Sequence, residues 1–99
     1  LATAHALAEH VGHAEIRAWC LETRAWQLLT GGHFAHAADL SRQAQAAAPR
    51  GSSAYIQATA QEGRAHARMG HGPQTRDALT RVEHLFVSAL TVFPGVRLR

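Results

Sequence analysis

The feature that most constrains the fold is a short motif that occurs twice, at Glu22 and again at Glu62. Glu22-Thr23-Arg24-Ala25 precedes the turn Gly31-Gly32-His33, and Glu62-Gly63-Arg64-Ala65 precedes the turn Gly70-His71. Each copy then leads into another alanine-rich amphipathic segment. Self-similarity at such a period, with one helical hairpin per copy, is typical of stacked helical repeats. Such folds generally present a surface that holds a partner.

Glycine and proline divide the chain into five segments with helical periodicity. The hydrophobic pattern predicts helices over about 2–10, 13–29, 33–47, 52–69 and 73–89. Val11-Gly12 is expected to separate the first two, glycines to end the helices before both turns, and Pro49 to prevent continuation of the third. Ser52 and Ser53 are candidate N-caps of the fourth. No segment alternates as a strand would, so we predict an all-α fold.

These helices predict a single domain over residues 1–90. Residues 1–12 are assigned to the remnant of a preceding repeat, 14–49 to the first full repeat and 52–88 to the second, whereas 91–99 are expected to form an irregular tail. Because the chain begins at Leu1 within a helical pattern, we expect it to be part of a longer protein. In the last helix the periodicity predicts inward residues (Thr75, Ala78, Leu79, Val82, Leu85, Phe86) and solvent-facing ones (Arg76, Asp77, Arg81, His84).

The charge distribution argues against nucleic-acid binding. The net charge is +3, all ten basic residues are arginine, and they are spread along the chain among seven acids. A nucleic-acid footprint would instead be a clustered basic stripe. Direct binding of nucleic acid therefore remains only an alternative.

Composition also indicates the compartment and the kind of core. The hydrophobic fraction is 46%, and nearly half of it is alanine, so the core should be thin and closely packed. The single cysteine, Cys20, excludes an internal disulfide, fits a reducing compartment and is expected to be a small core residue. We find neither an apolar stretch long enough to span a membrane nor a signal peptide, and expect a cytoplasmic location.

The chain resembles tetratricopeptide repeat proteins. The first repeat carries Ala25, Leu28, Gly32, Phe34, Ala37 and Pro49 at the intervals of that repeat, and the second carries Gly63, His66, Gly70 and Thr75. The resemblance implies an α-α superhelix of about five helices, comprising two repeats and a partial one. Since the step from Gly32 to Gly70 is shorter than the step from Glu22 to Glu62, one turn is expected to be about two residues longer.

A narrower resemblance covers most of the chain. Residues 18–70 and 73–85 are similar to the C-terminal sensor half of actinobacterial transcriptional regulators, in which an Xre-type helix-turn-helix precedes a tetratricopeptide-like domain. The run Ala48-Pro49-Arg50-Gly51-Ser52-Ser53-Ala54 is the most distinctive part. This resemblance implies sensing of a protein, peptide or small ligand, and dimerisation. It implies no direct DNA contact through this segment, because the DNA-binding half lies outside it.

The eight histidines invite a metal or catalytic interpretation. His33 and His36, like His10 and His13, are three positions apart, which places each pair on one helical face. A zinc site needs three or four converging ligands, however, so we expect structural or surface histidines and no metal or cofactor. No phosphate loop, dinucleotide fingerprint or hydrolase elbow occurs, and no enzymatic activity is expected.

The first helix of each hairpin should line the concave face of the stack. This places a candidate partner-binding surface on one repeat (Trp19, Glu22, Trp26, Leu29) and the next (Gln57, Arg64, Arg68). An apolar shelf bordered by arginines suits a peptide with an acidic group or a terminal carboxylate. The competing interpretation is that both tryptophans lie in the core and that the arginines form an ordinary solvated face. For the tryptophans we favour the core, because a chain with so few large residues needs its aromatic side chains inside.

Two functional hypotheses follow. The first is a non-catalytic module that binds a protein, peptide or ligand as part of a bacterial transcriptional regulator. The second is a structural module that joins copies of the chain into a homodimer or scaffold, because a short repeat array leaves an apolar face uncovered.

Overall fold

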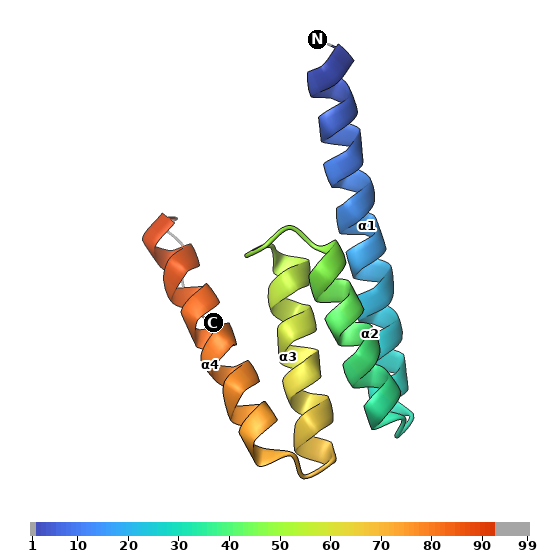
Figure 1. Cartoon of the computed structure of the whole chain (residues 1–99), viewed down its shortest axis with the longest axis vertical. Coiled ribbons are helices and arrows are strands. Elements are labelled where there is room, and N and C mark those ends of the chain that lie inside the picture. The colour runs from blue at the N-terminus through green and yellow to red at the C-terminus, as the bar shows by residue number, and fades with distance from the viewer. Residues whose placement is uncertain (1, 93–99) are drawn as a thin grey trace.

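The computed structural model describes the backbone of residues 2–92 and the side chains of residues 12–88. Over that range the chain forms four α-helices and no strand, namely α1 (Ala2–Thr30), α2 (Phe34–Ala47), α3 (Ser53–Arg68) and α4 (Gly72–Val92). Successive helices run antiparallel, and the N-terminal half of α1 projects beyond the other three (Figure 1). Helix α3 packs against α1, α2 and α4. The all-α prediction is confirmed. No helix in the described range is long and apolar enough to cross a membrane.

The prediction of five helices is wrong, because Gly12 does not interrupt the chain. The segments 2–10 and 13–29 form the single helix α1. A glycine inside a helix costs only about 1 kcal/mol relative to alanine, and ends the helix only where the backbone turns left-handed. Gly32, Gly51 and Gly70 have φ values of 87°, 82° and 76° and do so, whereas Gly12 has no positive φ.

The predicted difference in turn length is also wrong. The His33 N–H donates to the Leu28 carbonyl at 2.8 Å, and the His71 N–H donates to the His66 carbonyl at 2.9 Å. The other backbone hydrogen bonds of the first turn also recur in the second turn. In each case the donor and the acceptor are displaced by the number of residues that separates Gly32 from Gly70. The two turns are therefore alike, and we call two positions equivalent when they are separated by this Gly32-to-Gly70 step. The two Glu-x-Arg-Ala motifs are not equivalent in this sense.

The core is built from alanine, as its composition predicted. Its fully or nearly fully buried apolar residues are Ala18, Ala25, Ala37, Ala38, Ala44, Ala54, Ala58, Ala65 and Ala78. Small side chains allow the helices to approach closely. A Cβ added to Gly63 of α3 would lie 3.0 Å from the Cβ of Ala78 of α4, so contact between these two helices depends on that glycine.

The start of α3 follows the predicted capping chemistry. Ser52 is the N-cap, and its hydroxyl accepts a hydrogen bond from the Tyr55 N–H at 3.3 Å. The buried hydroxyls of Ser41 and Thr59 each donate to the carbonyl one turn earlier in their own helices, at 2.8 Å. These polar groups are thus satisfied inside an apolar core.

Helix α4 departs from its prediction in three respects. Leu79 and Phe86, expected to face inward, are 56% and 38% exposed. Arg81, expected to face solvent, is half-buried against Glu62. The helix also continues to Val92, so residues 91 and 92 are not an irregular tail. The remainder of the predicted tail, 93–99, lies outside the described residues.

Candidate functional site

A cleft joins the C-terminal ends of α1 and α3. It encloses a volume of about 460 Å³ and is lined by Trp26, Leu29, Thr30, Arg64, Ala67 and Arg68. Four of the seven residues predicted to bind a partner are therefore brought together: Trp26, Leu29, Arg64 and Arg68. Sequence reasoning missed Thr30 and Ala67. We refer to this surface as the α1–α3 cleft.

The two walls of the cleft are equivalent positions of the internal repeat. Trp26 of α1 corresponds to Arg64 of α3, and Thr30 corresponds to Arg68, each pair separated by the Gly32-to-Gly70 step. Leu29 likewise corresponds to Ala67, so the same offset would have found both missed residues. The same helical face thus contributes an apolar wall from α1 and a basic wall from α3.

The arginines and the tryptophan of the cleft are accessible. Arg64 and Arg68 are exposed, and neither guanidinium has a hydrogen-bond or ion-pair partner among the described residues. Trp26 is 46% exposed and Trp19 is 41% exposed, so the favoured prediction that both tryptophans lie in the core is wrong. The buried apolar positions between the helices are occupied by alanines instead. Two unpaired guanidinium groups beside a partly exposed indole can bind a carboxylate that has an apolar group next to it.

The other three predicted residues lie elsewhere. Glu22 is buried, and its carboxylate accepts a hydrogen bond from Gln61 Nε2 at 3.1 Å, so it joins α1 to α3 instead of lining the cleft. Gln57 is exposed and, with Arg64, lines a groove between α3 and α4. Trp19 lies on the outer face of α1 beside Cys20. Cys20 is exposed, so the prediction that it is a core residue is wrong.

An ion-pair cluster on the buried carboxylate of Glu62 joins α3 to α2 and α4. Gln45 Nε2 and Arg81 Nη2 donate to Glu62 Oε1 at 2.9 and 3.1 Å, and Arg81 Nη1 donates to Gln45 Oε1 at 3.2 Å. Arg42 Nη1 and His66 Nε2 lie 3.6 and 3.7 Å from Glu62 Oε2. One carboxylate of α3 therefore contacts both α2 and α4.

Burial of Glu62 works to raise its pKa, but its partners outweigh this effect. Hydrogen bonds from Gln45 and Arg81, together with the charges of Arg81 and Arg42, lower the pKa of the carboxyl below its ordinary value of 4.5. A carboxyl whose pKa is lower in the folded state stabilises the fold above its ordinary pKa. This stabilisation is lost as the pH falls through the folded-state value.

Acid should therefore destabilise the wild-type protein more than a Glu62→Gln variant. We expect the midpoint of thermal unfolding, followed by circular dichroism from pH 6 to pH 2.5, to fall less steeply with pH in Glu62→Gln, since the amide does not titrate. Glu15→Gln, which changes an exposed carboxylate of α1, is the matched control and should retain the wild-type pH dependence. Parallel pH profiles for wild type and Glu62→Gln would contradict this assignment.

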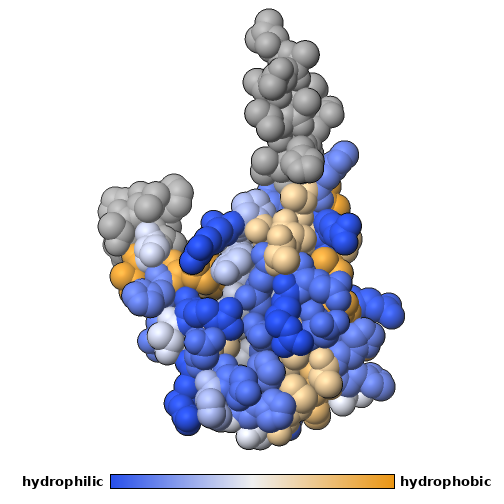
Figure 2. All heavy atoms as spheres, in the orientation of Figure 1, coloured by the Kyte–Doolittle hydropathy of each residue, from blue (hydrophilic) through white to orange (hydrophobic). Residues whose placement is uncertain are grey.

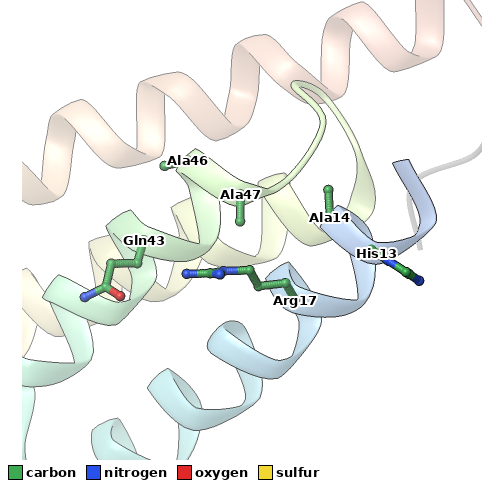
Figure 3. A pocket seen from close by; sticks show the side chains of 6 residues that line it. All are labelled: His13, Ala14, Arg17, Gln43, Ala46 and Ala47. Carbon is green, nitrogen blue, oxygen red and sulfur yellow. The ribbon is translucent and has the colours of Figure 1, made fainter. Parts of the chain in front are cut away.

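A second hollow, of about 500 Å³, lies between the middle of α1 and the end of α2. Figure 3 shows Arg17 extending from α1 into the space beside Gln43, with Ala46 and Ala47 of α2 above it, whereas His13 points away. Among the described residues, Arg17 is the only charged side chain that enters this hollow. The site therefore offers fewer converging groups than the α1–α3 cleft.

The described histidines do not form a metal cluster. No group of three or more His, Cys, Asp or Glu residues in that part of the chain is placed to hold a metal ion. His66 and His71 do approach each other, with 3.1 Å between their Nδ1 atoms, and they connect the end of α3 to the turn that follows. His33 and His36 are exposed on α2 and in its preceding turn.

No protein-family model, curated protein or solved structure matches this chain.

Proposed function

We propose that this chain is a non-catalytic interaction domain that binds an acidic peptide segment of a partner protein in the α1–α3 cleft. The observation that carries the proposal is the pairing of half-exposed Trp26 with the unpaired guanidinium groups of Arg64 and Arg68 in one cleft of about 460 Å³. An exposed indole supplies apolar contact area, and arginine binds carboxylates in a bidentate manner. The partner is thus a peptide with a carboxylate beside an apolar side chain.

The resemblance to the tetratricopeptide-like half of Xre-type regulators supports a wider context. We propose that the domain is the sensor part of a cytoplasmic bacterial transcriptional regulator, and that partner binding is its signal. Four antiparallel helices whose turns repeat from Gly32 to Gly70 are compatible with a tetratricopeptide-like superhelix. In this proposal DNA is contacted by another part of the regulator.

Selection from a random dodecapeptide display library tests the proposal. We expect the enriched peptides to carry Asp, Glu or a free terminal carboxylate next to an apolar residue. Fluorescence anisotropy of such a labelled peptide should show affinity about tenfold weaker for Arg64→Glu/Arg68→Glu, because two attractive charge contacts become repulsive. Trp26→Ala should also weaken binding by removing apolar contact area.

Arg76→Glu provides the matched control, since Arg76 is exposed on α4 and lines none of the hollows described above. It should bind the peptide as the wild type does. The proposal fails if no peptide is enriched. It also fails if the enriched peptides bind Arg64→Glu/Arg68→Glu as tightly as the wild type.

Assembly with further copies of the chain is the second candidate function. It is favoured by a separate observation, the open apolar groove between α3 and α4, with Leu79 56% exposed on its rim. This candidate concerns a different surface from the α1–α3 cleft, although Arg64 and Ala67 border both.

A further inference from the structure

An open groove with a mainly apolar lining lies between α3 and α4. It encloses about 570 Å³ above a floor of small residues, among them Ala60 and Gly63, and its rim includes Leu79, Val82 and Phe86. Figure 2 shows hydrophobic residues gathered over α4, whereas the surface beside them is mainly hydrophilic. We refer to this surface as the α3–α4 groove.

The equivalent groove of the first hairpin is filled by α3. Ser41 of α2 is fully buried beneath the packed helices, whereas its equivalent Leu79 is 56% exposed. Ala25 of α1 is likewise fully buried, and its equivalent Gly63 lies in the floor of the α3–α4 groove. In the first hairpin, α3 packs onto the surface formed by α1 and α2. The α3–α4 groove is the equivalent surface of the second hairpin, and no described helix packs onto it.

The opposite end of the molecule carries the complementary surface. The face of α3 that is buried in the bundle includes Ala58 and Gln61. Their equivalents on α1, Cys20 and Thr23, are exposed and line a shallow hollow on the outer side of that helix. The outer face of α1 is therefore equivalent to the face of α3 that packs against α1 and α2.

Charge complementarity supports a match between these two surfaces. Inside the molecule, Glu62 of α3 meets Gln45 of α2 at 2.9 Å. The equivalents of these residues are Arg24 on the outer face of α1 and Glu83 on α4. Both are exposed, and neither has an ion-pair partner among the described residues. Suppose that α1 of one molecule packs onto the α3–α4 groove of another in the way that α3 packs onto α1 and α2 of its own molecule. Arg24 of the first molecule then lies beside Glu83 of the second, and the two side chains carry opposite charges.

We propose that copies of this chain associate head to tail, with the outer face of α1 of one copy seated in the α3–α4 groove of the next. Such an interface is heterologous, so each dimer keeps one free α1 face and one free groove and can add further copies. The inference deepens the second candidate function and does not depend on peptide binding in the α1–α3 cleft. Peptide binding and head-to-tail association can therefore fail separately.

Single substitutions that block one surface each provide the test. Cys20→Arg blocks the α1 face and Leu79→Arg blocks the groove; both residues are exposed, so the monomer fold should be retained. In analytical ultracentrifugation over a range of about 5 to 500 µM, the wild type should form dimers and larger species that grow with concentration. Each blocked variant alone should remain monomeric, and Ala35→Arg, at an exposed position of α2, should behave as the wild type.

Mixing the two blocked variants distinguishes this arrangement from a twofold dimer. The free groove of Cys20→Arg can accept the free α1 face of Leu79→Arg, so an equimolar mixture should give a dimer that grows no further. A symmetric groove-to-groove interface instead predicts that Cys20→Arg alone dimerises as the wild type does, because its groove is intact, and that mixing with Leu79→Arg adds no association. The proposal is overturned by a wild type that stays monomeric throughout, by a mixture that stays monomeric, or by blocked variants that associate as the wild type does.

A charge-reversal cycle tests the registration of the interface. Arg24→Glu and Glu83→Arg should each weaken self-association about threefold to fivefold, and the double variant should recover it by restoring opposite charges. Additive weakening in the double variant would show that the two residues do not meet, and would overturn the proposed registration.

Discussion

Replacing Glu62 with alanine is expected to destabilise the protein by about 2 kcal/mol, since it removes the hydrogen bonds by which one buried carboxylate of α3 joins Gln45 of α2 and Arg81 of α4. The Glu62 side chain is only 10% exposed and lies 3.1 Å from Arg81 and 2.9 Å from Gln45. A domain of this size has a free energy of unfolding of roughly 5–15 kcal/mol. The loss should be clear in urea unfolding followed by circular dichroism.

Asp77→Ala is the matched control for this prediction. Asp77 also lies 3.1 Å from a nitrogen of Arg81, but its side chain is 69% exposed, so its loss should cost no more than about 1 kcal/mol. A double-mutant cycle of Glu62→Ala with Arg81→Ala should be non-additive by about 1 kcal/mol or more. Equal costs for Glu62→Ala and Asp77→Ala would refute the central role of the buried carboxylate.

Replacing Gly63 with valine is expected to destabilise the fold by about 2–3 kcal/mol through overpacking. The first added carbon already lies 3.0 Å from the Cβ of Ala78. Each Cβ is bonded directly to a helical backbone, so neither can move aside without moving its helix. Helices α3 and α4 must separate to admit the side chain. The free energy of unfolding from urea titration measures the effect.

Two further variants test whether the contact with Ala78 is the cause. Combining Gly63→Ala with Ala78→Gly moves the methyl group to the opposite helix and should be better tolerated than Gly63→Ala alone. Gly12→Ala should stabilise the protein by about 0.5–1 kcal/mol, because a Cβ at that helical position meets no heavy atom of the described residues within 4 Å. A Gly63→Val protein as stable as the wild type would contradict the close approach of α3 and α4.

The candidate site was predicted in part from the sequence. Trp26 and Arg64 were correctly placed on facing first helices of successive hairpins, because helical periodicity assigns them to one side of their segments. Glu22 was misplaced: a carboxylate is usually solvent-facing, and only the partner Gln61 on another helix explains its burial. Whether the cleft binds a peptide stays a prediction.

The internal register was settled by the turns and not by the more conspicuous repeated motif. Glu22 bonds to Gln61 between α1 and α3, whereas Glu62 contacts α2 and α4. The two copies of the motif therefore have different roles, because the distance between them along the chain differs from the distance between the two equivalent turns. Sequence similarity over one short motif carries less structural information than the position of a left-handed glycine.

Local chemistry was enough to place most helix boundaries, because capping by Ser52 and left-handed glycines act within a few residues of the chain. It was also enough to predict a core of alanine. Packing between helices decided the rest, since the burial of a side chain depends on what another segment places over it. Leu79 is exposed while its equivalent Ser41 is buried for this reason: α3 covers the first hairpin, and no described helix covers the second.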